Sequence, residues 1–372
     1  MTIGVLKEPS HETRVSLLPQ AVASLTKKNI KVVVEAAAGD KAWASNDDYQ
    51  KAGATIKSRN EVLQSSDILL SIHRLPVAEI KNLSSKIIIG VYQPLYNREL
   101  MQEWAKQGVT SFSLDMLPRT TRAQAMDVLS SQANIAGYKA VLVAANLYSR
   151  YFPMFMTAAG SIAPAKVLIL GAGVAGLQAI ATARRLGAVV EVFDTRPAVK
   201  EEVMSLGAKF VEVEGAADAS KAGGYAVEQS DEYKQRQQQK IAESIAKADI
   251  VITTAQIPGK RAPILITEEM IKKMRSGSLI IDIAAATGGN TPFTKNDETV
   301  VISGITIVGN SNLPATMPFD ASKLYGKNIL NFLQLITSKE GELYLNWEDE
   351  LVKGSCITHG GEVIHNRVVS LG

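Results

Sequence analysis

Three glycines in the middle of the chain have the spacing that lets a backbone loop hold a phosphate. Gly171, Gly173 and Gly176 follow an apolar run that ends at Leu170 and open a stretch with helical spacing. The first glycine permits a tight turn, the second lets the backbone approach a pyrophosphate, and the third allows close helix–strand packing. Free N–H groups at the start of the helix then favour the anion. We therefore predict a dinucleotide-binding loop made of Gly171, Gly173, Val174, Ala175 and Gly176.

A carboxylate follows the next predicted strand. Asp194 ends the apolar run 189–194, at the position where an acid accepts hydrogen bonds from the adenosine ribose hydroxyls. An acid here favours NAD, since the 2′-phosphate of NADP would meet like charge, although the nearby Arg196 weakens that preference. We place Thr195 and Arg196 in the same site. A purely structural glycine loop is the alternative, and a P-loop is excluded because no Gly-Lys-Ser/Thr follows the glycines.

Two further loops are expected beside this one. Ligands of parallel sheets lie outside the carboxyl ends of the strands. The loops after the predicted strands at 249–253 and 278–283 are therefore candidates, although glycine and proline also mark ordinary turns. The first supplies Gln256, Ile257 and Pro258, and the second is the segment 282–290.

The C-terminal segment carries three soft side chains, Cys356, His359 and His365. Structural zinc sites need four ligands, and no fourth stands nearby, so an irregular tail is the favoured interpretation and we predict no metal. No Ser-His-Asp or paired-carboxylate arrangement is placed by spacing.

Composition excludes several classes of protein. The 372 residues are 46% hydrophobic and 21% charged, which is typical of a globular chain with a substantial core. Forty Lys and Arg against 37 Asp and Glu leave a net charge of +3, too balanced for a nucleic-acid partner. A single cysteine allows no internal disulfide and indicates a reducing compartment. No signal peptide or membrane span is evident, and we expect a soluble chain.

Apolar, β-branched runs alternate with amphipathic stretches along the whole chain, which predicts an α/β protein with parallel sheets covered on both faces. Long helices are expected at 130–148 and 321–337. We predict two doubly wound, Rossmann-like domains with a cleft between them, the second inserted in the first. The N-terminal domain comprises 1–129 and 321–372. The dinucleotide-binding domain is 130–320, with a Gly/Ala/Ser-rich flexible segment near 214–232.

Several motifs resemble one family. The opening Gly4-Val-Leu-Lys7-Glu8-Pro9 and Glu12-Thr-Arg14-Val15 are similar to alanine dehydrogenases and to the NAD(H)-binding component of proton-translocating NAD(P) transhydrogenases. The segment 119–138 resembles the Arg–Gln–Asp loop of the transhydrogenases. Similarity continues through the glycine loop and through 194–197, 253–259, 284–290 and 321–331. The chain is thus identified as similar to the soluble domain I of the transhydrogenase alpha subunit.

The resemblance implies roles for individual residues. Arg119, Gln124, Asp127 and Ser130 would order the nicotinamide and face the partner nucleotide. Gly224 and Tyr225 match a mobile loop whose tyrosine closes over NAD(H). The same loop regions add Ala125, Met126 and Gln132 to the cofactor-binding set. A polar helix cap is the alternative interpretation of the segment around Asp127.

The resemblance also implies partners. NAD(H) would bind this chain, and NADP(H) a separate domain on another chain. A membrane domain on other chains would couple hydride transfer to proton translocation. We expect a homodimer without direct membrane insertion, held at the cytoplasmic face of the inner membrane through partner subunits.

Two other functions are weighed against this one. An alanine dehydrogenase needs an arginine for the substrate carboxylate, which Arg14 would supply, and also a histidine and a lysine. Gln93 stands at the histidine position, and 72–76 contains no lysine, so general acid–base catalysis lacks its proton carrier. A non-catalytic relative that senses NAD(H) is the third possibility, against which the intact Gln124 and Asp127 argue.

Overall fold

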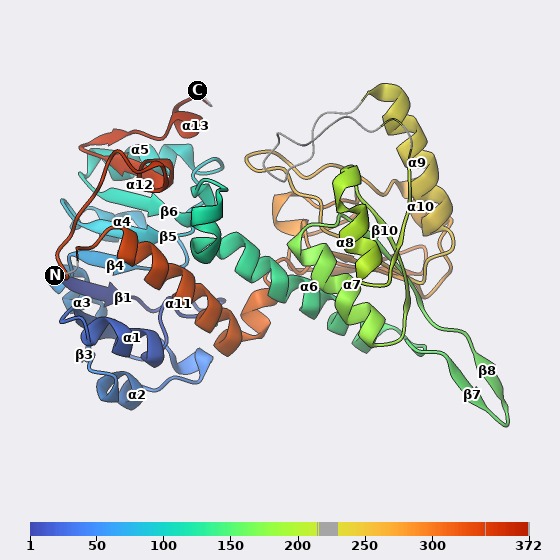
Figure 1. Ribbon diagram of the computed structural model, residues 1–372, viewed down its shortest axis with the longest axis horizontal. Coiled ribbons are helices and arrows are strands. Elements are labelled where there is room, and N and C mark those ends of the chain that lie inside the picture. Colours follow the sequence, from blue (N-terminus) through green and yellow to red (C-terminus); the bar gives the residue numbers. More distant parts are fainter. Residues whose placement is uncertain (214, 216–229, 339, 371–372) are drawn as a thin grey trace. The chain divides into compact units, whose positions relative to one another are not determined.

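The computed structural model describes residues 1–213, 215, 230–338 and 340–370. The chain divides into two compact units (Figure 1). Unit 1 comprises 1–132 and 315–372, and unit 2 comprises 133–314. The first division falls inside helix α6 (Val128–Leu147) and the second just ahead of α11 (Pro318–Leu335).

Unit 1 is built on a mainly parallel sheet with the strand order β17-β16-β6-β5-β4-β1-β2-β3. The chain fills the sheet from β1 outward to β3, then returns to β4 and fills the other side, so the order reverses between β1 and β4. Among the described strands of this sheet, the antiparallel pairs are those that β16, near one edge, forms with β6 and with β17. The strands are β1 (Thr2–Val5), β2 (Lys31–Glu35), β3 (Thr55–Lys57), β4 (Ile68–Leu70), β5 (Ile87–Gly90), β6 (Thr110–Ser113), β16 (Cys356–His359) and β17 (Glu362–Val363).

Successive side chains of the buried strands point to opposite faces of this sheet, so each face has its own hydrophobic core. Val32 and Val34 pack with the α11 side chains Ile329 and Phe332, whereas Val33 belongs to the core of the opposite face. That face is covered by α3, α4 and α5, which bring residues such as Trp104. The helices are α1 (Pro19–Thr26), α2 (Asn46–Lys51), α3 (Arg59–Ser65), α4 (Val77–Ile80), α5 (Arg98–Lys106), α11, α12 (Glu350–Ser355) and α13 (Asn366–Val369).

The C-terminal segment corrects one expectation. It is not an irregular tail, because β16 pairs with β6 through Cys356 and Thr358. A hydrogen bond joins the side chains of Ser111 and Thr358 at 2.7 Å. The apolar run around Ile357 is therefore a buried strand of the unit 1 sheet.

Unit 2 repeats the doubly wound plan with the order β11-β10-β9-β12-β13-β15-β14. Here the order reverses between β9 and β12, and β14 alone among the described strands of this sheet pairs antiparallel. The predicted α/β class with two doubly wound sheets is confirmed. The strands are β9 (Lys166–Leu170), β10 (Val189–Phe193), β11 (Lys209–Phe210), β12 (Ile250–Thr253), β13 (Leu279–Asp282), β14 (Thr299–Ile302) and β15 (Ile305–Val308).

The unit 2 sheet is also covered on both faces. Val167 and Ile169 pack with apolar residues of α6 and α7, whereas Leu168 and Leu170 pack with those of α9 and α10. Gly137 lets α6 lie against α7, because a Cβ there would stand 2.0 Å from the carbonyl oxygen of Ala175. The remaining helices are α7 (Val174–Arg185), α8 (Lys200–Ser205), α9 (Asp231–Ile245) and α10 (Glu268–Lys272).

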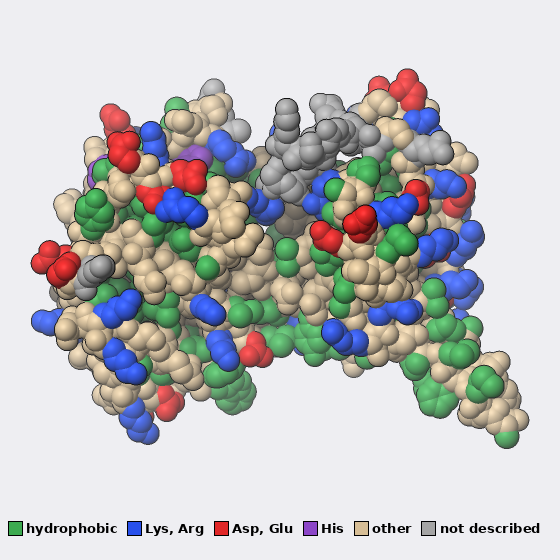
Figure 2. Space-filling model, viewed as in Figure 1, with side chains coloured by type: hydrophobic (Ala, Val, Ile, Leu, Met, Phe, Trp, Pro, Cys, Tyr) green, Lys and Arg blue, Asp and Glu red, His purple; other side chains and the backbone are tan. Residues whose placement is uncertain are grey.

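An unpredicted hairpin projects from unit 2 (Figures 1 and 2). It consists of β7 (Phe155–Thr157) and β8 (Gly160–Ile162), which form a separate two-stranded sheet. Its side chains are apolar yet exposed: Met156 is 75% exposed and Met154 63%. Within the described part of the chain, no helix combines the length and hydrophobicity needed to cross a membrane.

Candidate functional site

The glycine loop follows β9 at the point where the strand order of unit 2 reverses. Gly171 has φ +107°, a left-handed conformation that favours glycine, and its N–H donates to the carbonyl of Phe193. A Cβ at this position would lie 2.4 Å from Thr254 Oγ1. A Cβ on Gly176 would lie 1.9 Å from the carbonyl oxygen of Gly171. Both glycines are therefore required by the protein's own packing.

Gly173 is different, and its surroundings fit a bound pyrophosphate. A Cβ there would meet no atom of the described residues within 4 Å, and its φ of −77° is open to any residue. It is the N-cap of α7, and it has no side chain of its own to cap the helix. Uncapped N–H groups at a helix N-terminus beside open space are the arrangement that binds a phosphate. The residues present thus fit the predicted dinucleotide.

Asp194 lies where the sequence predicts, directly after β10, but its carboxylate is already engaged. Its Oδ2 accepts from the backbone N–H of Ala172 at 2.7 Å, which ties it to the glycine loop. Arg196 donates three further hydrogen bonds, from its backbone N–H, Nε and Nη2, at 2.8 to 2.9 Å. This bonding to Asp194 raises the pKa of the Arg196 guanidinium. A carboxylate has about four acceptor positions, so a ribose diol would have to displace Arg196.

The loops after β12 and β13 are tied to each other. Asn290 Oδ1 accepts from the backbone N–H of Ala255 at 3.2 Å, and its Nδ2 donates to the Ala255 carbonyl at 2.9 Å. Buried Asp282 holds the second loop by accepting from the N–H of Asn290 at 2.6 Å. Asn290, in the segment 282–290, is the residue that fixes the first loop. The predicted binding residues Gln256, Ile257 and Pro258 are exposed beyond the end of β12.

The predicted nicotinamide residues lie in unit 1, on the segment between β6 and α6 and at the start of α6. Arg119 and Gln124 are exposed, and Gln124 belongs to a short 3-10 turn, Thr121–Met126. Two amides of α11 hold this turn: Asn328 and Asn331 both donate to the carbonyl of Ala125, at 2.9 and 2.8 Å. Met126 is buried in the core below. The turn therefore presents Gln124 from a fixed backbone.

Asp127 and Ser130 are brought together at the start of α6. Asp127 Oδ1 accepts from the N–H of Ser130 at 2.9 Å, and its Oδ2 accepts from the Ser130 hydroxyl at 2.6 Å. This is the geometry of a helix N-cap. The cap interpretation therefore describes the local bonding of the pair, and an organising role for the two residues is an additional proposal.

The next turn of α6 carries Gln132, which is also held at both ends of its amide. Its Nε2 donates to the carbonyl of Ala321 at 3.1 Å, and its Oε1 accepts from Arg14 Nη1 at 2.8 Å. Sequence reasoning missed this contact, because 118 residues separate the partners. Gly224 and Tyr225, predicted to close over the nucleotide, lie outside the described residues.

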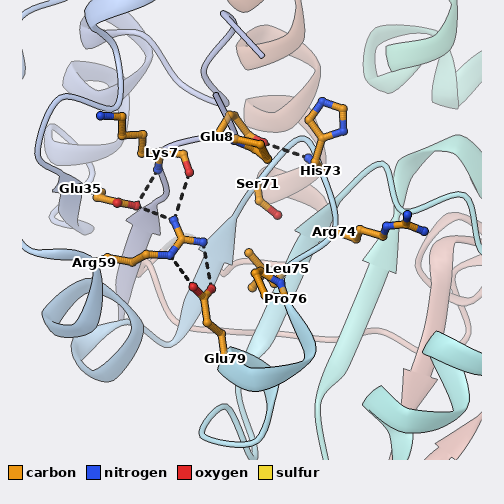
Figure 3. A pocket seen from close by; sticks show the side chains of 11 residues that line it. Lys7, Glu8, Glu35, Arg59, Ser71, His73, Arg74, Leu75, Pro76 and Glu79 are labelled. Atoms are coloured by element: carbon orange, nitrogen blue, oxygen red, sulfur yellow. Dashed lines mark hydrogen bonds and ion pairs between the residues drawn. The ribbon is translucent and has the colours of Figure 1, made fainter. Parts of the chain in front are cut away.

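A second crevice lies at the switch point of unit 1, where β1 and β4 end (Figure 3). The pocket measures about 350 Å³. Arg59 crosses it, with Nε and Nη2 on Glu79 and Nη1 on Glu35, at 2.7 to 2.9 Å. Glu8 accepts the backbone N–H groups of Ile72 and His73. Burial nevertheless raises the pKa of Glu8 from 4.5 to about 7.

The C-terminal soft side chains do not converge. Cys356 is buried, with its Sγ directed at the carbonyl of Thr358, and burial raises the pKa of this thiol to about 12. His359 contacts Thr110 and the ring of Trp347, whereas His365 bonds the carbonyl of Gly354. Across the described ranges, no group of three or more His, Cys, Asp or Glu side chains is arranged to hold a metal ion.

Family models match both halves of the sequence. The N-terminal domain of alanine dehydrogenase/PNT matches residues 4–136, and its C-terminal domain matches residues 140–366. The chain belongs to the alanine dehydrogenase/PNT family. The resemblance noted from the motifs is thereby confirmed.

Individual relatives divide the family further. The chain is 43% identical to the first part of the NAD(P) transhydrogenase subunit alpha of Rhodospirillum rubrum, over 100% of both chains. It is 27% identical to an alanine dehydrogenase of Staphylococcus haemolyticus, over 91% of this chain and 88% of that one. A solved transhydrogenase from Sinorhizobium meliloti shares 43% identity and superposes with a TM-score of 0.89, covering 98% of this chain and 100% of the other.

Proposed function

We propose that this chain is the NAD(H)-binding component of a proton-translocating transhydrogenase. The observation that carries the proposal is the full-length 43% identity to a transhydrogenase subunit of the same extent. It is supported by a glycine loop with open space at Gly173 and an acid at the end of β10. Hydride passes directly between NAD(H) on this chain and NADP(H) on a partner domain, and a membrane domain on other chains couples the reaction to proton movement.

The chain's residues hold and orient the nucleotide. The uncapped start of α7 binds the pyrophosphate. Asp194, with Thr195 beside it, receives the adenosine ribose once the side chain of Arg196 moves off the carboxylate. Gln256, Ile257 and Pro258 line the loop after β12. Bound NADH supplies the hydride at its nicotinamide ring. Arg119, Gln124, Asp127 and Ser130 orient that ring, with Ala125, Met126 and Gln132 supporting them, and positioning is the main catalytic effect.

Alanine oxidation is the second candidate, and the structure gives specific evidence against it. The arginine that would bind the substrate carboxylate, Arg14, is buried and paired with Glu12 through two side-chain bonds. Gln93, at the position of the required histidine, carries no titratable proton. Exchange of hydride between two nicotinamides needs neither group, because no proton is gained or lost at the reacting carbons.

The proposal includes association with other chains. The exposed apolar hairpin β7–β8 supports a homodimer, since a two-stranded sheet is only marginally stable alone in water. A second copy of the chain would cover Phe155, Met156 and Ile162. The chain would then lie at the cytoplasmic face of the inner membrane through its partner subunits.

One mixing experiment tests the function. The purified chain is combined with the NADP(H)-binding domain of a transhydrogenase, NADH and an NADP⁺ analogue, and reduction of the analogue is followed. Alanine with NAD⁺ is the parallel reaction. We expect hydride transfer only in the first mixture, and turnover only with alanine would reverse the assignment. Binding of NADH without turnover in either mixture would identify a sensing relative instead.

A substitution separates the organising role from the helix cap. Asparagine caps a helix about as well as aspartate. Asp127→Asn therefore keeps the cap on Ser130 while it removes the charge. We expect hydride transfer to slow by roughly tenfold or more with NADH affinity nearly unchanged, in line with a loss of positioning. An unaltered rate would leave Asp127 with the cap alone.

A further inference from the structure

Unit 1 contains a buried ion pair, Glu12 with Arg14, to which the proposed transhydrogenase function has so far given no role. Arg14 donates to Glu12 twice from its side chain, Nε to Oε1 at 2.9 Å and Nη2 to Oε2 at 2.7 Å. The Glu12 side chain is 0% exposed and that of Arg14 is 9% exposed. Burial alone would raise the pKa of Glu12, but hydrogen bonds from Arg14 and His73 hold that pKa well below its usual range. These bonds therefore favour the ionised form of the Glu12 carboxyl.

The segment that carries the pair is fixed at several points. The backbone N–H of Val15 donates to Ser322 Oγ on α11 at 2.9 Å, and Thr13 donates to the carbonyl of Ala315. Glu12 also accepts the backbone N–H groups of Thr13 and Arg14, at 3.0 and 2.9 Å. Both charged side chains therefore start from a rigid backbone and have little freedom to reorient.

One N–H of this arginine points away from Glu12 to α6. Arg14 Nη1 donates to Gln132 Oε1 at 2.8 Å, while Gln132 Nε2 is held by the carbonyl of Ala321 at 3.1 Å. The amide of Gln132 is thereby fixed at both ends. Gln132 lies two residues after Ser130 on the same helix, one turn beyond the cap formed by Asp127. The planar guanidinium of an arginine can donate to both Glu12 oxygens and to Gln132 at once, which the ammonium of a lysine does less well.

Stability alone is a weak reason for such a pair. Two charges removed from water lose hydration that their mutual attraction barely recovers, and an apolar replacement of similar volume is often equally stable. The geometric effect of the pair is specific, because it fixes a side chain at the start of α6. That helix start carries Asp127 and Ser130.

We propose that Arg14, held by Glu12, is a positioning residue for hydride transfer: it fixes the amide of Gln132 and, through it, the first turns of α6. The inference rests on the proposed function. It gives Arg14 a different task from binding a substrate carboxylate, because its guanidinium is committed to Glu12 and Gln132. Arg14 acts through Gln132 and touches no reacting atom.

The test compares Arg14→Lys, Gln132→Ala and the double variant in the mixing assay. Glu12→Gln is avoided, since it would leave a buried arginine without its counter-charge and risk unfolding. Arg14→Lys keeps the charge beside Glu12 but loses the fork. We expect kcat to fall roughly tenfold in each single variant, as misplacement of a reacting group does. In Arg14→Lys, which leaves the cofactor-binding residues in place, NADH affinity should stay within about twofold of that of the parent chain. The double variant should be no slower than Gln132→Ala alone, because both changes break one contact.

Arg59→Lys is the matched control. Arg59 is also a forked arginine of unit 1, bound to Glu35 and Glu79, but it has no contact with α6 among its bonds (Figure 3). We expect it to lower the melting temperature without changing kcat. The inference is overturned if Arg14→Lys leaves kcat unchanged, if its effect adds to that of Gln132→Ala, or if kcat and NADH affinity fall in parallel. A parent chain that binds NADH but transfers no hydride would instead overturn the proposed function, and this inference with it.

Discussion

The two glycines that flank the start of α7 make opposite predictions, which allows the nucleotide loop to be tested without a bound ligand. At Gly173 the backbone has φ −77° and ψ −170°, and a Cβ would meet nothing within 4 Å. Gly173→Ala should therefore fold about as well as the parent. The gain of about 0.4 to 1 kcal/mol from the lower conformational freedom of alanine is offset by the poorer helix N-cap that alanine makes. At Gly176 a Cβ would lie 1.9 Å from the carbonyl oxygen of Gly171, so the backbone must shift, at about 1 to 3 kcal/mol.

The effects of the two substitutions on nucleotide binding should differ from their effects on stability. The methyl group of Gly173→Ala would occupy the space into which we place the pyrophosphate, and would hold the phosphate off the N–H groups of α7. Loss of one hydrogen bond to a charged group costs about 1.5 to 3 kcal/mol, which lowers NADH affinity by roughly ten- to hundredfold. Thermal unfolding and NADH fluorescence titration measure the two effects separately. If the Gly173→Ala variant bound NADH like the parent, the assignment of this loop to the pyrophosphate would be refuted. If it were as unstable as Gly176→Ala, the open geometry would be refuted.

Three other predictions test separate features. Asp194→Asn should weaken NADH binding by roughly tenfold or more and leave Arg196 available to a 2′-phosphate, so the NADH-to-NADPH preference should fall in titrations. Asp249→Asn, which loses an ion pair at the opposite end of the sheet, should leave that preference unchanged. The pKa of Glu8 is about 7 in the folded chain against 4.5 ordinarily, so the stability gained from the bound proton is complete below pH 4.5 and lost as the pH rises through 7. Glu8→Gln should accordingly raise the free energy of unfolding at pH 8, by up to about 3 kcal/mol, and hardly change it at pH 4. Denaturation curves of the parent and the variant that differ by the same amount at both pH values would contradict this prediction. Met156→Glu on the exposed hairpin should convert the expected dimer to a monomer, as measured by light scattering, without lowering the melting temperature of unit 2. If the parent chain is already monomeric, the homodimer is no longer part of the proposed function.

The fold could be predicted because both sheets are buried on two faces. Continuous apolar runs such as Lys31–Glu35 and Lys166–Leu170 coincide with β2 and β9. The edge strands were harder to predict. β16 pairs with β6, nearly 250 residues earlier, through contacts such as that of Thr358 with Ser111. The hairpin β7–β8 buries none of its strand residues, so no burial pattern marks it.

The positions of the candidate site residues in the fold could be predicted from the sequence, but their bonding much less so. The structure places the glycine loop and the acid after β10 at one switch point of the sheet, as their spacing predicts. The saturation of Asp194 by Arg196 depends on how an arginine side chain folds back, which spacing does not determine. The role of Arg14 is equally hard to predict from the sequence. The motif that contains it is similar in alanine dehydrogenases and in transhydrogenases, so the motif does not distinguish the two activities. The contacts of Arg14 with Glu12 and Gln132 do bear on that choice.

The two activities weighed above differ in what they require of unit 1, and the contacts of Arg14 bear on the choice between them. Oxidation of an amino acid needs an arginine to bind the carboxylate and a side chain that takes up a proton. In this chain Arg14 is paired with Glu12, and a glutamine, Gln93, stands where the resemblance places the proton carrier. Hydride exchange between two nicotinamides needs only that both rings be held in contact, for which fixed polar groups suffice. The turn held by Asn328 and Asn331, the cap of Asp127 and the doubly bound amide of Gln132 are fixed groups of that kind. Under the proposed function, the contact of Arg14 with Gln132 links the two sets of requirements, because it occupies a guanidinium that would otherwise be open to a substrate carboxylate.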